Sequence, residues 1–389
     1  MTNDDALLDD FRDIAAWGAV ASGEAQLRLH ADVSTDGQAA LRLEYDFKSG
    51  GGFVVARRNL ERAMPTAWAL SLRVRGAAPA NKLEIKLADK SGRNVWWWHH
   101  GAFAFPGDWI TLRIRSSEVS FAWGPAGGGT LDQLGALEIA IAAGPGGRGT
   151  VWISDLRFED LSLTRPPLAT ASSAHPGHEP ERALDASPAT WRAAAAEPLA
   201  WFALDFGRAH EYGGLVIDWA GAGAARTFEV ECSDDATSWR TLACATQAEG
   251  ERSYVYLPGG GCSRHLRLSM HELLAGAGMP EIRTLDVRPF DFSRSLADFF
   301  HAVAAREPRG HYPRWLYREQ SYWTPVGVAG GATAAILNEE GMFEPDRASF
   351  SLEPFLHVDG ELITWADAEI SVSLANGVLP IPSSIWRRG

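Results

Sequence analysis

Short segments in which polar and apolar residues alternate recur through residues 1–289, and this pattern constrains the fold more than any other feature. Successive side chains of a β-strand point to opposite faces, so each segment offers one face to a core and one to solvent. Turn sequences such as Asp36-Gly37 and Pro106-Gly107 separate the segments. Many short strands joined by tight turns predict an all-β fold of antiparallel sandwiches. The expected strands are 26–30, 41–47, 69–75, 83–87, 110–115, 201–206, 214–219 and 227–232.

Proline-containing junctions divide the chain into three parts. The run Arg165-Pro-Pro-Leu168 interrupts the alternation, as a linker does, and Pro289 marks the next boundary. We therefore expect domains at 1–164, 165–289 and 290–389. The third is predicted to open with a helix at 293–306, with Ser293 as N-cap, and to continue with strands at 333–337 and 370–374. It lacks a second face to complete a core, so we expect the incomplete start of a further, mainly β domain.

Charge and hydropathy argue against several classes of partner. The net charge is −13 and no run of lysine and arginine forms a basic stripe, so nucleic-acid binding is not expected. No stretch reaches about 18 consecutive apolar residues, so no membrane span is expected. The acidic start, Met1-Thr-Asn-Asp-Asp5, lacks the regions of a secretory signal. The protein is therefore expected to be cytoplasmic, or exported if a leader has been removed; the sequence leaves the oligomeric state open.

The chain contains 16 tryptophans, most densely in Asn94-Val-Trp-Trp-Trp-His-His100. In a strand, Trp96 and Trp98 face one side and Trp97 faces the other. The core cannot take all three without breaking the alternation, so at least one indole is expected to face outward. Together with Trp123, such an indole forms a sugar-binding platform, packs against a neighbouring domain, or joins the core of its own domain. We favour the platform.

A series of motifs runs in order along residues 168–288. They are Ala169-Thr-Ala-Ser-Ser173, Arg182-Ala-Leu-Asp185, Thr190-Trp191, Trp201-Phe-Ala-Leu-Asp-Phe-Gly207, Phe228-Glu-Val-Glu-Cys-Ser233 with Asp235 and Trp239, Arg264-His-Leu-Arg-Leu268 and Glu281-Ile-Arg-Thr-Leu-Asp-Val287. In this order they resemble the discoidin, or coagulation factor 5/8 type C, domain, which overlaps the galactose-binding-like carbohydrate modules. The resemblance implies a β-sandwich.

The same resemblance implies ligands for this domain. Family members often hold a structural calcium ion, and Asp185, Thr190 and Glu281 match the positions that do so, although Ala186 stands where the family has glycine. Calcium prefers six to eight oxygen ligands. Sugars are held in the family by a few loop residues, typically an aromatic ring beside His, Arg or Glu. The candidates for sugar contact here are His175, His178, Trp219 and Arg226, whereas Trp191 and Trp201 match positions that pack the core.

Three further motifs mark residues 8–161. They are Asp9-Asp-Phe-Arg-Asp13, Ser34-Thr-Asp-Gly37 before Ala40-Leu-Arg-Leu43, and Val151-Trp-Ile-Ser-Asp-Leu156. Together they resemble the jelly-roll carbohydrate-binding modules attached to polysaccharide-active enzymes. Such modules commonly hold a structural calcium ion, and the matching positions here are Asp10, Asp36 and Asp155, with Arg12 where many relatives have glutamate. The predicted fold is thus two consecutive β-sandwich domains, jelly-roll and galactose-binding-like, before a partial C-terminal segment.

Catalytic motifs are missing from the sequence. It contains no G-x-S-x-G elbow, HExxH, P-loop or nucleotide-binding glycine fingerprint. Segments 314–325 and 353–360 are loosely similar to the β-sandwich that precedes the (α/α) barrel of six-hairpin glycosidases, which implies that the acid and base lie outside this chain. Most C-terminal carboxylates lie in turn-like stretches and are expected to be solvated: Glu319, Glu339, Glu340, Glu344, Asp346, Glu353 and Asp367.

Two functions from different classes follow. The favoured one is carbohydrate binding by tandem non-catalytic modules, as the N-terminal part of a glycoside-active enzyme. The alternative is an adhesion or interaction protein whose discoidin-like domain binds protein or lipid headgroups. Aromatic residues around 96–123 favour the first, and exposed apolar loops in the second module would favour the second.

Overall fold

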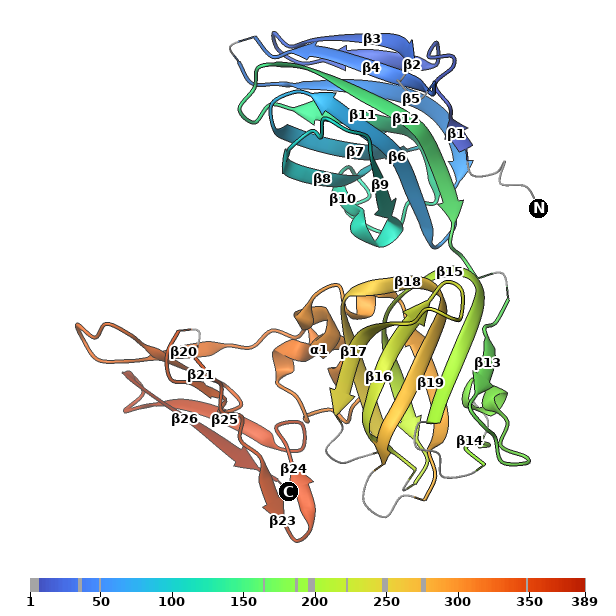
Figure 1. The fold of residues 1–389 in the computed structure, drawn as a ribbon. Helices are drawn as coiled ribbons and strands as arrows, with labels where there is room; N and C mark the ends of the chain where they lie inside the picture. Colours follow the sequence, from blue (N-terminus) through green and yellow to red (C-terminus); the bar gives the residue numbers. More distant parts are fainter. Residues whose placement is uncertain are drawn as a thin grey trace.

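The structure, a computed structural model, describes residues 7–33, 37–48, 50–163, 165–185, 188–194, 200–221, 223–246, 251–273, 278–347 and 349–388. Figure 1 shows two β-rich domains in succession, with a smaller C-terminal part beside the second. The predicted all-β fold is confirmed, and each predicted strand lies wholly or largely within an observed one.

The first domain is a sandwich of two antiparallel sheets. One sheet has the order β3-β4-β12-β6-β9, with β1 paired to β12, and the other has the order β10-β8-β7-β11-β5-β2. The strands are β1 (Leu7–Asp9), β2 (Trp17–Ala21), β3 (Gln26–Val33), β4 (Ala39–Asp46), β5 (Phe53–Ala63), β6 (Trp68–Ala77), β7 (Asn81–Asp89), β8 (Val95–Phe103), β9 (Ile110–Arg115), β10 (Ser120–Trp123), β11 (Gln133–Ala142) and β12 (Arg148–Asp160).

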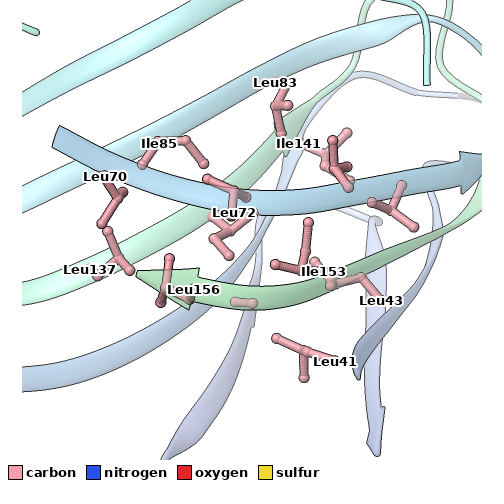
Figure 2. Close-up of a cluster of buried hydrophobic side chains, with 14 of the residues drawn as sticks. Leu41, Leu43, Leu70, Leu72, Leu83, Ile85, Leu137, Ile141, Ile153 and Leu156 are labelled. Carbon is pink, nitrogen blue, oxygen red and sulfur yellow. The ribbon is translucent and has the colours of Figure 1, made fainter. Parts of the chain in front are cut away.

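Leucine and isoleucine side chains from both sheets meet in the core of this sandwich (Figure 2). Leu41, Leu43 and Leu72 come from the first sheet, and Leu83 and Ile141 come from the second; all five are fully buried. Each alternates along its strand with a residue on the outer face. Period-2 patterning thus gives each sheet one face in the core and one outer face.

The second domain is built around two long bent strands. Its strands are β13 (Leu168–Ala171), β14 (Trp191–Arg192), β15 (Ala200–Trp219), β16 (Ala225–Ser233), β17 (Arg240–Thr246), β18 (Arg252–Leu273) and β19 (Glu281–Arg288). β15 pairs with β18 along most of its length, and the register shifts between Asp205 and His210. β13 pairs with the first half of β15 and β19 with the second half. Because of this shift, the two halves of β15 belong to different layers of the domain. These layers enclose a core of Trp191, Phe202, Tyr212, Trp219 and Phe228.

The first two domains contact each other through a buried carboxylate. Glu211 of β15 accepts a hydrogen bond from the Ser117 hydroxyl and lies 3.3 Å from the Arg115 guanidinium. Burial raises the pKa of Glu211 above its usual range. Arg208 also donates to the backbone carbonyl of Asp160 at 3.0 Å. These charged contacts fasten the end of one sandwich to the end of the other.

The C-terminal part opens with a helix that starts later than predicted. Helix α1 spans Leu296–Ala304, and the hydroxyl of Ser295 accepts from the backbone N–H of Asp298 as its N-cap. Ser293 was the predicted cap, but its hydroxyl is buried and shares its one proton between the carbonyls of Gly213 and Leu257. That serine therefore ties the segment to the second domain. None of the described helices has the length and apolar composition to cross a membrane.

Small sheets with exposed apolar side chains complete the C-terminal part. The strands are β20 (Trp323–Val326), β21 (Ala335–Asn338), β22 (Phe343–Glu344), β23 (Leu356–Val358), β24 (Glu361–Ile363), β25 (Glu369–Ala375) and β26 (Leu379–Arg387). They form one three-stranded sheet and two hairpins. Val372, Ile381 and Ile385 are exposed on the last hairpin. The part is mainly β, as predicted, and its sheets have little core of their own.

Glu340 and Glu353 are not solvated, contrary to the prediction from their turn-like sequence. Glu340 is buried and accepts from Arg314 Nε at 2.5 Å. Both carboxylate oxygens of Glu353 are buried with no hydrogen-bond partner within the described chain. Burial, and secondly the charge of Glu340, raise the pKa of Glu353 to about 7. The two carboxylates lie together because distant segments fold over them, which sequence spacing does not reveal.

We expect Glu353 to make the stability of the C-terminal part depend on pH. Its pKa in the folded state is raised above the usual 4.5, so the stability contribution is complete below pH 4.5 and is lost as pH rises through about 7. Allowing for solvent screening of a partly exposed group, the loss should be about 1–2 kcal/mol. Chemical denaturation at pH 5 and pH 8 should show this loss in the wild type and not in Glu353→Gln. A Glu361→Gln variant is the exposed control, and an equal pH dependence in all three proteins would contradict the assignment.

Candidate functional site

The three tryptophans of β8 divide between the two faces of their sheet as the alternation predicted. Trp96 is buried, donates its indole N–H to the Gly129 carbonyl at 2.9 Å, and meets the Phe121 ring at 5.3 Å. Trp98 is half-buried and packs against the same core. Trp97 lies on the other face, so the interpretation that all three indoles join the core is wrong.

Trp97 is part of an aromatic group on the outer face of this sheet. Its ring centroid lies 4.6 Å from that of His99 and 5.8 Å from that of Trp123, which meets it edge-on. Trp123 ends β10 and is 47% exposed. A register shift between Phe121 and Trp123 sets Trp123 opposite Val95. We call Trp97, His99 and Trp123 the open-face cluster.

An ion pair lies beside the open-face cluster on the neighbouring strand. Lys86 and Glu84 of β7 stand opposite Trp97 and His99 in the register. Their Nζ and Oε2 atoms are 2.9 Å apart, and both residues are buried although the strand places them on the outer face. Lys86 Nζ lies 5.5 Å from the Trp123 ring centroid. The face therefore combines apolar rings with fixed hydrogen-bonding groups. This pair was not among the predicted site residues, although Glu84 and Lys86 occupy the outward positions of a predicted strand.

A hydrogen-bonded chain in the second domain joins three predicted site residues. The Thr190 hydroxyl donates to Glu281 Oε1 at 2.5 Å. A hydroxyl has one proton, so the contact of 2.9 Å between Thr190 Oγ1 and His178 Nδ1 makes the imidazole the donor. The arrangement fixes the tautomer of His178 and joins the segment before β14 to the start of β19.

A cavity of about 530 Å³ lies next to this chain. Its polar lining residues are His175, Arg192 and Glu281, and the rest of the lining is mostly alanine and glycine. The His175 and His178 rings meet edge to face at 5.6 Å. Arg192 was not a predicted site residue, although it follows the core residue Trp191 on a strand and therefore points the other way. The cavity has room and polar groups for one small ligand.

Trp219 is not a ligand-binding residue. It ends β15, is fully buried, and donates its indole N–H to the Ser253 hydroxyl at 2.8 Å. Arg226 is exposed on β16 and does not line the cavity. Trp191 is fully buried, as predicted, whereas Trp201 is half-buried and lines a second hollow of about 330 Å³ on the outer face of the sheet.

Comparison with known proteins assigns the second domain. Residues 169–277 match the family model described as the F5/8 type C domain. This part of the chain is an F5/8 type C domain. No curated protein matches the chain.

Solved structures similar to parts of the chain include carbohydrate-binding modules. One is the family 11 module from Clostridium thermocellum in complex with a β-1,3-1,4-mixed-linked tetrasaccharide, at 16% identity over 40% of this chain and 95% of that one, with a TM-score of 0.35. Another is the family 32 module of NanJ from C. perfringens with galactose, at 17% identity over 31% and 92%, with a TM-score of 0.29. Chitosan-binding module 2 from Paenibacillus sp. IK-5 with chitotriose is 19% identical over 33% and 99%, with a TM-score of 0.29.

The predicted calcium ligands of the F5/8 type C domain converge only in part. Thr190 and Glu281 bond to each other, but no hydrogen bond or ion pair joins the exposed Asp185 to either of them in the described chain. Among the described residues no group of three or more His, Cys, Asp or Glu is arranged to hold a metal ion. Since calcium prefers six to eight oxygens, these side chains do not make up a site by themselves. Calcium in this domain stays a prediction.

The predicted calcium ligands of the first domain are engaged in other contacts. Asp155 accepts from Arg157 at 2.8 Å, and Asp10 pairs with Arg12 at 3.3 Å. Asp36 lies outside the described residues. The neighbouring Asp9 is the buried anchor instead, because it accepts from the Trp17 indole at 2.7 Å and from Arg58 at 2.6 Å. Calcium in this domain also stays a prediction.

Thermal unfolding in calcium and in chelator tests the predicted ion of the F5/8 type C domain. An ion held by the folded state alone, at a hundredfold excess over its Kd, adds about 2.7 kcal/mol. We expect Glu281→Gln to abolish this increment and the exposed-site variant Glu272→Gln to keep it. A wild-type melting curve that chelator leaves unmoved would remove calcium from the account.

Proposed function

We propose that the chain binds carbohydrate, and that the open-face cluster of the first domain is its main contact surface. The observation that carries the proposal is the Trp97–Trp123 pair, held on the outer face of a sheet beside the ion pair of Lys86 and Glu84. Sugar rings present apolar C–H faces and a rim of hydroxyl groups. Indoles offer a flat apolar partner for the first, and a fixed ammonium and carboxylate offer hydrogen bonds to the second.

Rigidity supports this role. Trp97 is wedged between His99 and Trp123, and Lys86 is held by Glu84, so few side-chain rotamers remain to be fixed when a ligand arrives. Apolar surface left open beside buried charge is costly to a free domain, and a stacked sugar would cover it. The arrangement is therefore suited to a ligand that is both flat and polar.

The cavity of the F5/8 type C domain supplies a second candidate contact. His175, Arg192 and Glu281 line it with one imidazole, one guanidinium and one carboxylate. These groups suit the hydroxyls of a single terminal sugar, whereas the open-face cluster suits a longer chain. The alternative proposal, binding of protein or lipid headgroups through this domain, calls for exposed apolar loops. In the described part of residues 165–289, Leu168 is the single large apolar side chain that is exposed.

We further propose that the modules serve a glycoside-active enzyme and that this chain is not catalytic by itself. Glycosidases need two carboxylates that both reach the substrate. Glu340 and Glu353 lie close together in the C-terminal part, but Glu340 Oε2 and both oxygens of Glu353 are buried. A substrate does not reach atoms covered in this way.

Replacing either indole of the open-face cluster should weaken glycan binding. Loss of an aromatic stacking surface costs on the order of 1–3 kcal/mol of binding free energy, by analogy with base stacking. Isothermal titration of Trp97→Ala and Trp123→Ala against a panel of neutral oligosaccharides should show this loss. Trp315, which is 43% exposed in the C-terminal part, provides the matched control in Trp315→Ala. Equal affinities in all four proteins would refute the proposed surface.

The chain should show no turnover of aryl glycosides or polysaccharides in a panel of substrates. The reason is that Glu340 and Glu353, which lie close together in the C-terminal part, keep three of their four carboxylate oxygens buried without a hydrogen-bond partner in the described chain. Turnover that survives purification and disappears in Glu340→Gln or Glu353→Gln would show that the chain is an enzyme.

A further inference from the structure

An arginine lies between two indoles on the other sheet of the first domain. Arg75 of β6 stands opposite Trp152 of β12 in the register, and its Cζ atom is 4.5 Å from the Trp152 ring centroid. The ring centroid of Trp109, which lies just before β9, is 5.5 Å from the same Cζ atom. All three side chains are half-buried. This sheet lies across the core from the open-face cluster, so the group belongs to a different surface.

The charge of Arg75 is uncompensated. No carboxylate forms an ion pair with Arg75 within the described chain, and its Nε–H is buried without an acceptor. The indole Nε1–H of Trp109 is likewise buried without an acceptor. The stack of Trp109, Arg75 and Trp152 therefore contains two buried N–H donors without an acceptor and one cation without an ion-pair partner in the described chain. Such groups are costly unless a hydrogen-bond acceptor completes them.

The neighbouring positions on the outer face of this sheet contact carboxylates, although Arg42 Nε is, like Arg75 Nε, buried without an acceptor in the described chain. Trp152 donates its Nε1–H to Asp32 Oδ2 at 2.9 Å. Arg42, on the other side of Trp152, lies 3.3 Å from Asp32 and 3.2 Å from Glu44. Among the described residues, carboxylates thus contact Trp152 and Arg42, and none pairs with Arg75 or Trp109. The net charge of the chain is −13, yet among the described residues the neighbours of Arg75 are indoles and not carboxylates.

We propose that Arg75 and Trp109 bind an anionic group of an acidic glycan. A carboxylate or sulfate oxygen accepts from the Arg75 guanidinium and from Trp109 Nε1–H, while the flanking indoles contact the sugar ring that carries the anion. The N–H donors of Arg75 and Trp109 favour binding of an oxyanion. The flanking indoles favour an oxyanion that is attached to a flat, partly apolar sugar ring. The inference rests on the proposed carbohydrate binding but assigns it a second surface and an acidic sugar class.

Binding of three purified oligosaccharides to the full chain tests the proposal. The probes are an oligogalacturonate, which carries carboxylates, a heparin-derived oligosaccharide, which carries sulfates, and a neutral cello-oligosaccharide. We expect at least one acidic probe to bind, and Arg75→Gln to weaken it about tenfold or more, because a charge-assisted hydrogen bond is lost. Arg75→Lys should restore part of the affinity. The control is Arg28→Gln, which removes one exposed charge from β3 of the same sheet and should change the affinity less than twofold.

The outcomes separate this inference from the proposed function. Weakening of the acidic probe alone by Arg75→Gln, with the neutral probe still sensitive to Trp123→Ala, supports both. The inference is overturned if no acidic probe binds, or if Arg75→Gln and Arg28→Gln weaken the acidic probe equally. In either case a neutral probe that depends on Trp123 leaves the proposed function standing. Melting curves of each variant show whether a lost affinity comes from a lost fold.

Discussion

The pleat of strand β8 places three consecutive tryptophans under one constraint. Side chains alternate across a strand, so a core on one side of the sheet takes Trp96 and Trp98 and must leave Trp97 on the other. A shift by one residue would bury Trp97 and expel both of its neighbours, so the three rings also fix the register. Trp123 and His99 pack on the displaced indole, and Lys86 and Glu84 lie beside them. The open-face cluster therefore follows from the same rule that builds the core.

The proposed contact surfaces lie on two domains that are joined to each other. Glu211, Arg115 and Ser117 join the jelly-roll sandwich, which carries the open-face cluster, to the F5/8 type C domain, which carries the His175–Arg192 cavity. Two weak contacts on one polymer chain reinforce each other when their spacing is fixed, because the second becomes intramolecular. The proposed role of Arg75 would add a preference for anionic sugars, which the stacking of neutral rings on indoles does not provide.

Local patterning predicted the strands, whereas contacts between distant segments had to come from the structure. The pattern of Leu215, Ile217 and Trp219 at every second position of one strand indicated that Trp219 shares the buried face, and its assignment as a ligand contact overlooked this. Arg75, Trp109 and Trp152 meet only because β6, β9 and β12 are neighbours, and spacing in the sequence does not encode that order. Arg314 and Glu340 are likewise brought together by the fold. Ser293 and Ser295 both suit a helix cap, and burial of the first decided between them.

We propose that sugar rings stack on the outward indoles of the first domain and not on those that fill its core. Two-dimensional nitrogen–proton spectra resolve each tryptophan through its indole N–H, and single Trp→Phe variants assign Trp96, Trp97, Trp98 and Trp123. The account predicts that titration with a bound neutral oligosaccharide shifts the signals of Trp97 and Trp123 progressively and moves those of Trp96 and Trp98 little. Saturable binding that leaves the Trp97 and Trp123 signals in place would contradict it.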